Sequence, residues 1–372
     1  MKIVVIGAGL GGLALAQRLV KADIDVDVYE RDSAVEARFQ GYRIGFGGPG
    51  LKALEGAVPA RLHPLLDAVS GLIEQPGRLV DAQLSVLGEQ GQIDNEGRMF
   101  DRNVLRHLLI TGLGERLRFD LKLDRYEELA DGAVRAHFAD GSTVDADVLV
   151  GADGMGSTVR RQLLPQIGVH DLPVYGAIGR TELAGFEHII PGWSTMVSTK
   201  NVQLMLGRMK FQRPPVEAAA ELAPDVTLPD TPSYIRWVLM LPGAPKTLDL
   251  QPVLDLMHDW HPDLRALIAQ ADVNNSGVSP IKEGDPIEPW PTRAVTLLGD
   301  SGHPAPPGGL GANLAMVDAE LLADKLIAVR DGRREKIPAL ADYERQMCEN
   351  AKIGRESAAQ AFKNFAKLRA EA

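Results

Sequence analysis

Six residues near the start of the chain have the types and spacing needed to hold a phosphate. Residues 7–12 read GAGLGG, which satisfies G-x-G-x-x-G. In such a turn the first glycine permits a tight bend, the second lets backbone approach a pyrophosphate, and the third lets a helix pack closely on a strand. The helix N-terminus carries roughly half a positive charge, so the phosphates need no lysine. Glu30 ends the next predicted strand, where a carboxylate accepts a hydrogen bond from a ribose hydroxyl. These features predict a bound dinucleotide without distinguishing FAD from NAD; the alternative is a glycine-rich turn that binds nothing.

Two later segments repeat the pattern of a buried strand that runs into a polar turn. Residues 148–154 end in Asp153 and a glycine, and Arg160 lies in the first turn of the helix that follows. Asp300 ends another such strand and precedes the glycine-rich loop 301–313. An aspartate at a strand end can accept a hydrogen bond from a ribityl or ribose hydroxyl, and a loop leading into a helix can present N–H groups to the pyrimidine edge of a flavin. Each segment alone is equally compatible with an ordinary turn or surface loop.

Taken together, these segments resemble the group A flavoprotein monooxygenases, the para-hydroxybenzoate-hydroxylase-like enzymes, and the compact length is similar to that of their tetracycline-inactivating branch. The patterns G-x-G-x-x-G, D-G-x-x-S-x-x-R, G-D-x-x-H-x-x-x-P and G-x-G-x-N occur in the family's order, and the resemblance covers essentially the whole chain. Arg102 lies in a D-R-x-x-L-x-x-x-L match whose arginine contacts FAD in this family. Residues 40–44 (QGYRI) resemble the segment that runs past the flavin ring, which makes Arg43 a candidate flavin or substrate contact.

The resemblance implies noncovalent FAD, reduction by NADPH or NADH without a second nucleotide domain, and oxygen transfer through C4a-hydroperoxyflavin to an aromatic, polyketide-like or other electron-rich small molecule. No side chain is then catalytic; the loop residues Pro307, Gly308 and Gly309 lie beside the ring, and His303 anchors the loop. This loop is one residue shorter than the family pattern, and Ser301 and a glycine replace the common Ala-Ala, so its position beside the ring is expected to differ. The residues expected to contact FAD are Gly7, Gly9, Leu10, Gly12, Glu30, Arg31, Arg43, Arg102, Asp153, Asp300, Gly311, Ala312 and Asn313.

A substrate pocket is expected at the domain interface, between an antiparallel sheet and the flavin. Alternation along residues 202–211 places several side chains on one strand face, and its methionines suit an adaptable apolar pocket. Any single one of these residues could equally belong to the core. The expected substrate contacts are Met205, Met209, Phe211 and Trp237.

The elements that must position these residues indicate an α/β fold: a Rossmann-type FAD-binding domain with an inserted antiparallel-sheet substrate domain and a C-terminal helix. Residues 3–6, 13–20 and 25–30 are typical of a strand, a helix and a strand, the beginning of a βαβ unit. Strand-like runs without interleaved helices between 172 and 285 indicate the inserted sheet. The expected boundaries are 1–75, 98–171 and 286–337 for the FAD-binding domain, 76–97 and 172–285 for the substrate domain, and 338–372 for the helix.

Composition argues against several other classes of function. The chain has 372 residues and a net charge of −10, which disfavours nucleic-acid and anionic-membrane surfaces. The single cysteine, Cys348, excludes an intramolecular disulfide and is typical of a reducing cytoplasm. The eight histidines lack metal-ligand spacing, so no metal site is expected. We therefore expect a cytoplasmic monomer or homodimer whose partners are a small-molecule substrate and molecular oxygen.

Two other functions are compatible with these residues. The shortened loop at 307–311 is compatible with a FAD-dependent reductase or dehydrogenase, or with a flavin-bound cyclase that transfers no oxygen. The second alternative is a non-catalytic FAD-binding sensor or sequestering protein. Halogenation is disfavoured because the sequence contains no W-x-W-x-I-P pattern.

Overall fold

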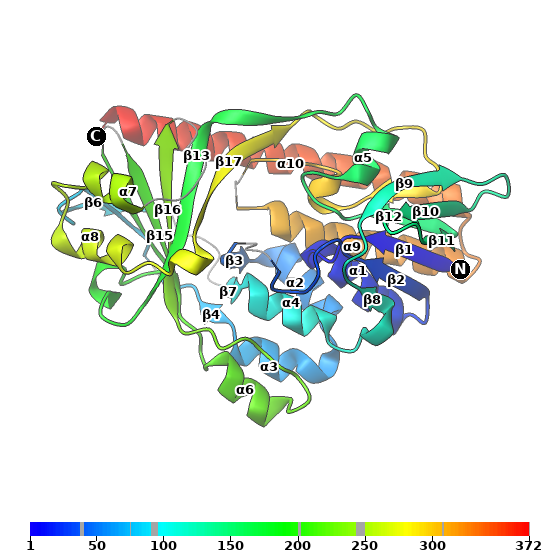
Figure 1. Cartoon of the computed structure of the whole chain (residues 1–372), viewed down its shortest axis with the longest axis horizontal. Helices are drawn as coiled ribbons and strands as arrows, with labels where there is room; N and C mark the ends of the chain where they lie inside the picture. Colours follow the sequence, from blue (N-terminus) through cyan, green and yellow to red (C-terminus); the bar gives the residue numbers. More distant parts are fainter. Residues whose placement is uncertain are drawn as a thin grey trace.

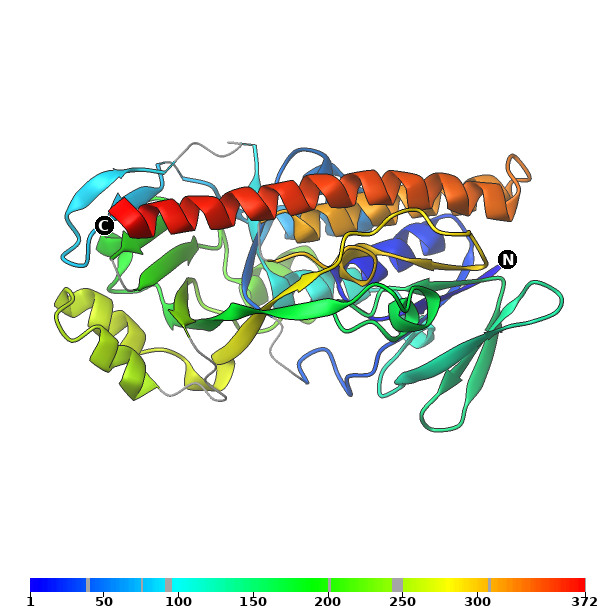
Figure 2. The same cartoon turned by 90° about the horizontal axis from the view of Figure 1, so that it is seen from above.

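The computed structural model describes residues 1–37, 41–74, 76–90, 96–199, 202–242, 250–306 and 309–371. Figure 1 shows a Rossmann-type part around a parallel sheet and a second part around a larger antiparallel sheet. A long C-terminal helix runs beside both parts, as Figure 2 shows from above. The α/β fold class expected from the sequence is confirmed.

A five-stranded parallel sheet organises the Rossmann-type part. Its order is β18 (Val295–Leu297), β12 (Val148–Gly151), β1 (Lys2–Ile6), β2 (Asp25–Tyr29) and β8 (Leu117–Arg118). The central strands are apolar and almost entirely buried, because a parallel sheet is covered on both faces. The covering elements are α1 (Leu10–Lys21), α4 (Arg102–Ile110), α9 (Gly311–Arg330), α5 (Thr158–Leu163) and a three-stranded antiparallel sheet of β9 (Leu123–Glu128), β10 (Val134–Phe138) and β11 (Thr143–Ala146).

A seven-stranded sheet organises the second part. Its order is β17 (Gly277–Gly284), β13 (Val169–Glu182), β16 (Tyr234–Pro242), β15 (Gln203–Met209), β14 (Ser194–Ser198), β5 (Arg78–Val80) and β6 (Val86–Glu89). All neighbours are antiparallel except β14 and β5. One face builds a separate hydrophobic core with α7 (Leu250–Leu256) and α8 (Pro262–Ala269). The opposite face is turned toward the Rossmann-type part, since Gly207 on β15 lies against Arg43 of that part.

Short elements join the two large sheets. They are the small sheet of β3 (Arg43–Phe46), β7 (Arg98–Asp101) and β4 (Gly71–Leu72), the helices α2 (Gly48–Ala57), α3 (His63–Ala68) and α6 (Pro215–Leu222), and the 3-10 turns η1 (Ala60–Leu62), η2 (Gly114–Arg116), η3 (Glu187–Ile189), η4 (Val273–Asn275) and η5 (Gly299–Ser301). The small sheet matters most for the site, because it carries both Arg43 and Asp101.

The C-terminal helix α10 (Lys336–Glu371) packs on α9 and reaches both parts of the molecule. The hydroxyl of Tyr343 donates to the carbonyl oxygen of Leu297 on β18 at 2.7 Å. Farther along, Arg355 donates to the carbonyl oxygen of Gly284 and to Glu283, at the end of β17. Across the ranges given above, no helix combines the length and apolar character needed to cross a lipid bilayer.

Candidate functional site

The glycine turn between β1 and α1 leaves no room for side chains at two positions. Gly7 has φ +110°, and a Cβ there would lie 2.3 Å from the carbonyl oxygen of Ala152. A Cβ at Gly12 would lie 2.2 Å from the carbonyl oxygen of Gly7. Around Gly9, by contrast, the nearest protein atom would be 4.0 Å from such a Cβ. The turn is therefore packed tightly against β12 and open at its middle glycine.

The N-terminus of α1 next to this turn is suited to an anion. Its N-cap is Gly9, no side chain caps the first turn, and no acidic residue lies in that turn. The first N–H groups of a helix have no partner within the helix, so they are available to a phosphate. Leu10, expected from the sequence to contact the cofactor, is buried at this helix start. The open middle glycine and the uncapped helix start fit the pyrophosphate of a dinucleotide.

Glu30 supports the glycine turn from the end of β2. Its carboxylate accepts hydrogen bonds from the backbone N–H of Ala8 at 2.8 Å and from that of Asp32 at 2.9 Å. A carboxylate has about four acceptor positions, so a ribose hydroxyl can share this group with the protein. Arg31 is exposed and lies 4.0 Å from the Asp32 carboxylate. A cofactor contact for Glu30 and for Arg31 stays a prediction.

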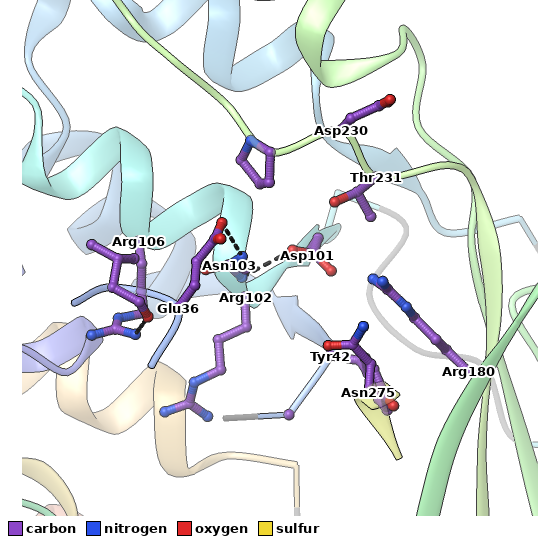
Figure 3. Close-up of a pocket in the computed structure, with 13 residues that line it drawn as sticks. Glu36, Tyr42, Asp101, Arg102, Asn103, Arg106, Arg180, Asp230, Thr231 and Asn275 are labelled. Atoms are coloured by element: carbon purple, nitrogen blue, oxygen red, sulfur yellow. Dashed lines mark hydrogen bonds between the residues drawn. The ribbon is translucent and has the colours of Figure 1, made fainter. Parts of the chain in front are cut away.

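A cavity of about 400 Å³ lies between α4 and the antiparallel sheet. Figure 3 shows Arg102 and Arg106 on one side of it and Arg180, from β13, on the other. Arg106 joins this cavity to the glycine turn, because its guanidinium donates to the carbonyl oxygen of Val35 at 2.6 Å and to that of Ala8 at 3.2 Å. The sequence analysis missed Arg106. The signal was its place one helical turn after Arg102, on the same face of α4.

Asp101 connects the start of α4 to the antiparallel sheet. Its side chain caps the helix by accepting the N–H groups of Asn103 and Val104, and it also accepts the hydroxyl of Tyr234 on β16 at 2.8 Å. Burial raises the pKa of Asp101, although these hydrogen bonds and Arg180 act in the opposite direction. The wall of the cavity is therefore held by contacts across the two parts of the molecule.

The second and third motifs of the sequence meet through side chains at the ends of β12 and β18. Asp153 accepts the hydroxyl of Ser157 at 2.5 Å, that of Ser301 at 3.2 Å and the N–H of Thr158 at 2.6 Å. From the next helix, Arg160 donates to the carbonyl oxygens of Ser301 at 3.0 Å and of Asp300 at 3.3 Å. These side chains hold the turn that carries Asp300. Contact of Asp153 with a cofactor stays a prediction, beside this bracing role.

A buried pair anchors the same loop from behind. His303 Nε2 lies 2.6 Å from Asp318 Oδ2 on α9, and Asp318 is 0% exposed. Burial lowers the pKa of His303, but the carboxylates of Asp318 and Asp300 together with a backbone hydrogen bond raise it above the usual value. Asn350 of α10 donates to the other oxygen of Asp318 at 3.4 Å. The structure places His303 as a loop anchor, turned toward α9.

The start of α9 lies beside Asp300 and β3. A Cβ at Gly311 would have the Asp300 carboxylate as its neighbour, at 3.6 Å. Asn313 donates to the carbonyl oxygen of Gly45 at 2.9 Å and accepts the N–H of Gly47 at 3.2 Å. The side chain of Asn313 is thus bonded to backbone groups of β3 and its neighbour. The backbone N–H groups of Gly311, Ala312 and Asn313 lie at a helix start that no side chain caps. Pro307 and Gly308 lie outside the described residues; Gly309 has φ +86°.

Arg43 bridges the two parts of the molecule. Its guanidinium donates to the carbonyl oxygens of Trp193 at 2.7 Å and of Arg208 at 2.9 Å, and it lies 5.6 Å from the centre of the Trp193 ring. Burial, together with the positive charge of Arg236, lowers the pKa of Arg43 to about 9. The bonds of Arg43 therefore go to the antiparallel sheet, and its contact with flavin or substrate stays a prediction.

The structure corrects one of the expected substrate residues. Trp237 is 0% exposed and belongs to the core beneath α7 and α8, on the face of β16 that points away from the Rossmann-type part. Met209 is 0% exposed, and Phe211 is also buried; both belong to the main core. The assignment of Trp237 is wrong, because its side chain fills the core on the other face of the sheet. Substrate contacts of Met209 and Phe211 stay predictions. Met205 remains, half-buried on the face turned toward the Rossmann-type part.

Within residues 1–371, apart from the gaps in the described ranges, no group of three or more His, Cys, Asp or Glu side chains is placed to hold a metal ion. The site offers instead an uncapped helix start, two further glycine-rich strand ends and a cavity lined by arginines.

Comparison with known proteins identifies FAD as the cofactor that fits these features. A sequence profile described as an NAD(P)-binding Rossmann-like domain matches residues 5–55, and one described as a FAD binding domain matches residues 265–352. The chain is 30% identical to a solved structure named as a FAD-containing monooxygenase from Photorhabdus luminescens subsp. laumondii TTO1, with a TM-score of 0.83 over 99% of this chain and 98% of that chain. Tetracycline destructase Tet(51) shares the fold, with 19% identity and a TM-score of 0.65 over 100% of this chain and 95% of that chain.

Curated relatives agree. The FAD-dependent urate hydroxylase of Mycolicibacterium vanbaalenii is 28% identical over 94% of this chain and 85% of its own length. The dual O-methyltransferase/FAD-dependent monooxygenase CTB3 of Cercospora beticola is 30% identical over 94% of this chain, which spans only 44% of that relative's length. The glycine turn, the two further strand ends and the FAD-domain match lie on separate segments that form one site. Together with these relatives, they show that the chain belongs to the family of FAD-dependent monooxygenases.

Proposed function

We propose that the chain catalyses the NAD(P)H-dependent insertion of one oxygen atom into an electron-rich organic molecule. The observation that carries this proposal is that three strand ends, far apart in the sequence, lie at one edge of the parallel sheet and are braced there by backbone packing and by side chains. Arg106 ties α4 to the glycine turn, and Arg160 ties α5 to the turn of Asp300. FAD, when bound, supplies the redox chemistry that lets NAD(P)H and molecular oxygen react with an organic substrate.

The residues of the chain bind and orient the cofactor. The open backbone at Gly9 and the start of α1 would hold the pyrophosphate of FAD, while Glu30 and Asp300 would accept hydrogen bonds from its ribose or ribityl hydroxyls. The N–H groups at the start of α9 would bind the pyrimidine edge of the flavin and favour the negative charge of its reduced form. The buried His303–Asp318 pair fixes the loop between these groups. No side chain is required as a nucleophile or as a metal ligand.

The antiparallel sheet supplies the substrate side of the site. Its face toward the Rossmann-type part combines apolar side chains, among them Met205, with cationic ones, among them Arg236. Such a surface suits a flat molecule that has both an apolar body and a polar edge. The names of the relatives, which include a urate hydroxylase, support a small heteroaromatic or aromatic substrate.

Oxygen tracing tests the proposal. The purified chain is reconstituted with FAD and supplied with NADPH or NADH, isotopically labelled molecular oxygen and a panel of phenols, purines and polyketides. The expected result is NAD(P)H oxidation accelerated by a subset of compounds, with one labelled oxygen atom in their products by mass spectrometry. If no compound of the panel gains labelled oxygen and all the oxygen consumed is recovered as hydrogen peroxide, the chain is better described as a reductase or a non-oxygenating flavoprotein.

A further inference from the structure

Arg236 stands apart from the other arginines in and around the antiparallel sheet. Arg180 pairs with Asp272 at 3.2 Å, and Arg208 pairs with Glu74. Arg43 donates to two backbone carbonyls. Arg236 is half-buried, yet within the described residues its guanidinium has no hydrogen bond or ion pair, and its Nε is enclosed without an acceptor.

The strand register shows where this guanidinium lies. Arg236 is opposite Gly207 on β15 and opposite Arg180 on β13, so all three residues share the face that looks toward the Rossmann-type part. Gly207 has no side chain to separate Arg236 from Arg43, and a Cβ there would lie 2.9 Å from Arg43 Cζ. Arg43 fills the space that a side chain at Gly207 would take, so its guanidinium lies close to the strand beside Arg236. Positive charge is therefore concentrated at this point of the face, because Arg236 also acts on the pKa of Arg43.

Among the described residues, no carboxylate neutralises this charge. The ionisable group that favours the charged form of Arg236 is Tyr234, a phenol that stays neutral near pH 7 because burial raises its pKa. Burial itself lowers the pKa of Arg236. Asp101, the acid that accepts the hydroxyl of Tyr234, is already bonded to Asn103 and Val104 as well. A desolvated guanidinium without a counter-charge is costly, so a site of this kind is completed by an anion from outside the chain.

We propose that Arg236 is the specificity-determining residue of the substrate site and that the substrate is an organic anion, whose carboxylate or ionised hydroxyl oxygen pairs with this guanidinium. The inference rests on the proposed function, because it places the anion beside the flavin. Arginine suits this role, since its planar fork can form two parallel hydrogen bonds to a carboxylate. The apolar body of the molecule lies along Met205 and Val238, which are cross-strand neighbours on the same face.

Matched pairs of acids and amides test the inference on the FAD-loaded protein. The probes are benzoate and benzamide, 4-hydroxybenzoate and 4-hydroxybenzamide, and salicylate and salicylamide, with binding read from the change in flavin absorbance. The parent protein is expected to bind the acids about 10- to 100-fold more tightly than the amides, the range of a charge-assisted pair. Arg236→Gln is expected to abolish this preference while leaving amide binding unchanged, and Arg236→Lys to restore part of it.

Controls separate this role from a structural one. Arg265→Gln removes the same charge from the exposed face of α8, far from the inner sheet face, and is expected to keep the full preference. FAD content and thermal unfolding show whether Arg236→Gln folds. If Arg236→Gln does not fold, Arg236→Met, which keeps the length of the side chain, is used in its place. The ratio of acid affinity to amide affinity in the parent protein is then decisive.

Two results would overturn the inference. The first is a parent protein that does not prefer acids to amides. The second is an acid preference that survives in Arg236→Gln; if the flavin reduction potential of that variant is also lowered, the guanidinium interacts with the flavin instead. The proposed function fails by a different result. If the acid preference depends on Arg236 but labelled oxygen never enters a product, the anion site stands and oxygen transfer does not.

Discussion

Gly7 and Gly9 lie two residues apart in one turn, but an added methyl group would meet different surroundings at the two positions. At Gly7 it would collide with the Ala152 carbonyl oxygen and require a left-handed backbone, so Gly7→Ala is expected to lower the free energy of unfolding by about 1–3 kcal/mol or more. At Gly9 it would lie 4.0 Å from the Ala152 carbonyl oxygen, an unstrained distance, so Gly9→Ala is expected to cost less than about 1 kcal/mol, mainly through a poorer helix cap. Urea unfolding of the FAD-free protein measures both.

The same pair of variants separates folding from cofactor binding. The methyl group at Gly9 occupies the space through which a pyrophosphate approaches the backbone, so the affinity for FAD is expected to fall by about tenfold or more. Gly277→Ala, where an added Cβ meets open space, serves as the control. It should change neither the free energy of unfolding nor the affinity for FAD. Unchanged FAD affinity in Gly9→Ala would show that the phosphates lie elsewhere.

Glu344 makes stability depend on pH. Burial raises the pKa of this carboxyl, against its hydrogen bond from Thr292, from 4.5 to about 7. Because the folded state holds the proton more tightly than the unfolded state, the stabilisation is fully present below about pH 4.5 and is lost as the pH rises through about 7. Glu344→Gln keeps the acceptor for Thr292 and removes the titration. At pH 8 it is expected to raise the free energy of unfolding by roughly 2–3 kcal/mol.

Urea unfolding between pH 5 and 8 checks this expectation. Glu349→Gln, an exposed change on the same helix, should leave the slope of stability against pH unaltered. A slope in Glu344→Gln equal to that of the parent would assign the pH dependence to another group.

At the scale of elements, alternation along a strand is readable from sequence, whereas the direction of each face is not. Residues 234–241 alternate between two sets, and both sets contain large apolar side chains. Helices α7 and α8 cover the set that includes Trp237, and the set that includes Arg236 faces the Rossmann-type part. This choice depends on where α7 and α8 pack, a contact between distant segments that no local pattern in the strand reveals. The prediction of Trp237 failed for this reason.

The junction between α4 and β16 is one contact that can be measured directly. Asp101 caps α4 and accepts the hydroxyl of Tyr234, so Asp101→Ala removes two interactions and Tyr234→Phe removes one. We expect losses of about 2–4 kcal/mol for Asp101→Ala and about 1–2 kcal/mol for Tyr234→Phe. The double variant is expected to be less destabilised than the sum, by a coupling energy of about 1 kcal/mol. Strict additivity in this double-mutant cycle would mean that the hydroxyl contributes nothing across the junction.

For the whole molecule, the sequence analysis located the three strand ends because each is followed by glycines, two of them with an aspartate, and parallel strands present their carboxyl ends at one edge of a sheet. It did not predict which side chains brace the assembled site by donating to backbone carbonyls. Arg106 reaches the carbonyl oxygen of Ala8, and Arg43 reaches those of Trp193 and Arg208, across large separations in the chain. Such contacts depend on the assembled fold, and an arginine that will donate to backbone looks in sequence like one that will bind a ligand.

Because the FAD site is assembled from segments that are distant in the chain, cofactor removal should act on the whole Rossmann-type part. A ligand that binds only the folded state stabilises it by about 2.7 kcal/mol at roughly 100 times its Kd, so apoprotein is expected to unfold at a lower temperature and to recover as FAD is added. Hydrogen exchange should show residues 7–12, 102–106 and 299–306 losing protection together. The core of Trp237 with α7 and α8, which contributes none of these segments, should keep its protection and acts as an internal control. Equal melting of apoprotein and FAD-saturated protein, or loss of protection confined to one segment, would contradict a single site built from these three segments.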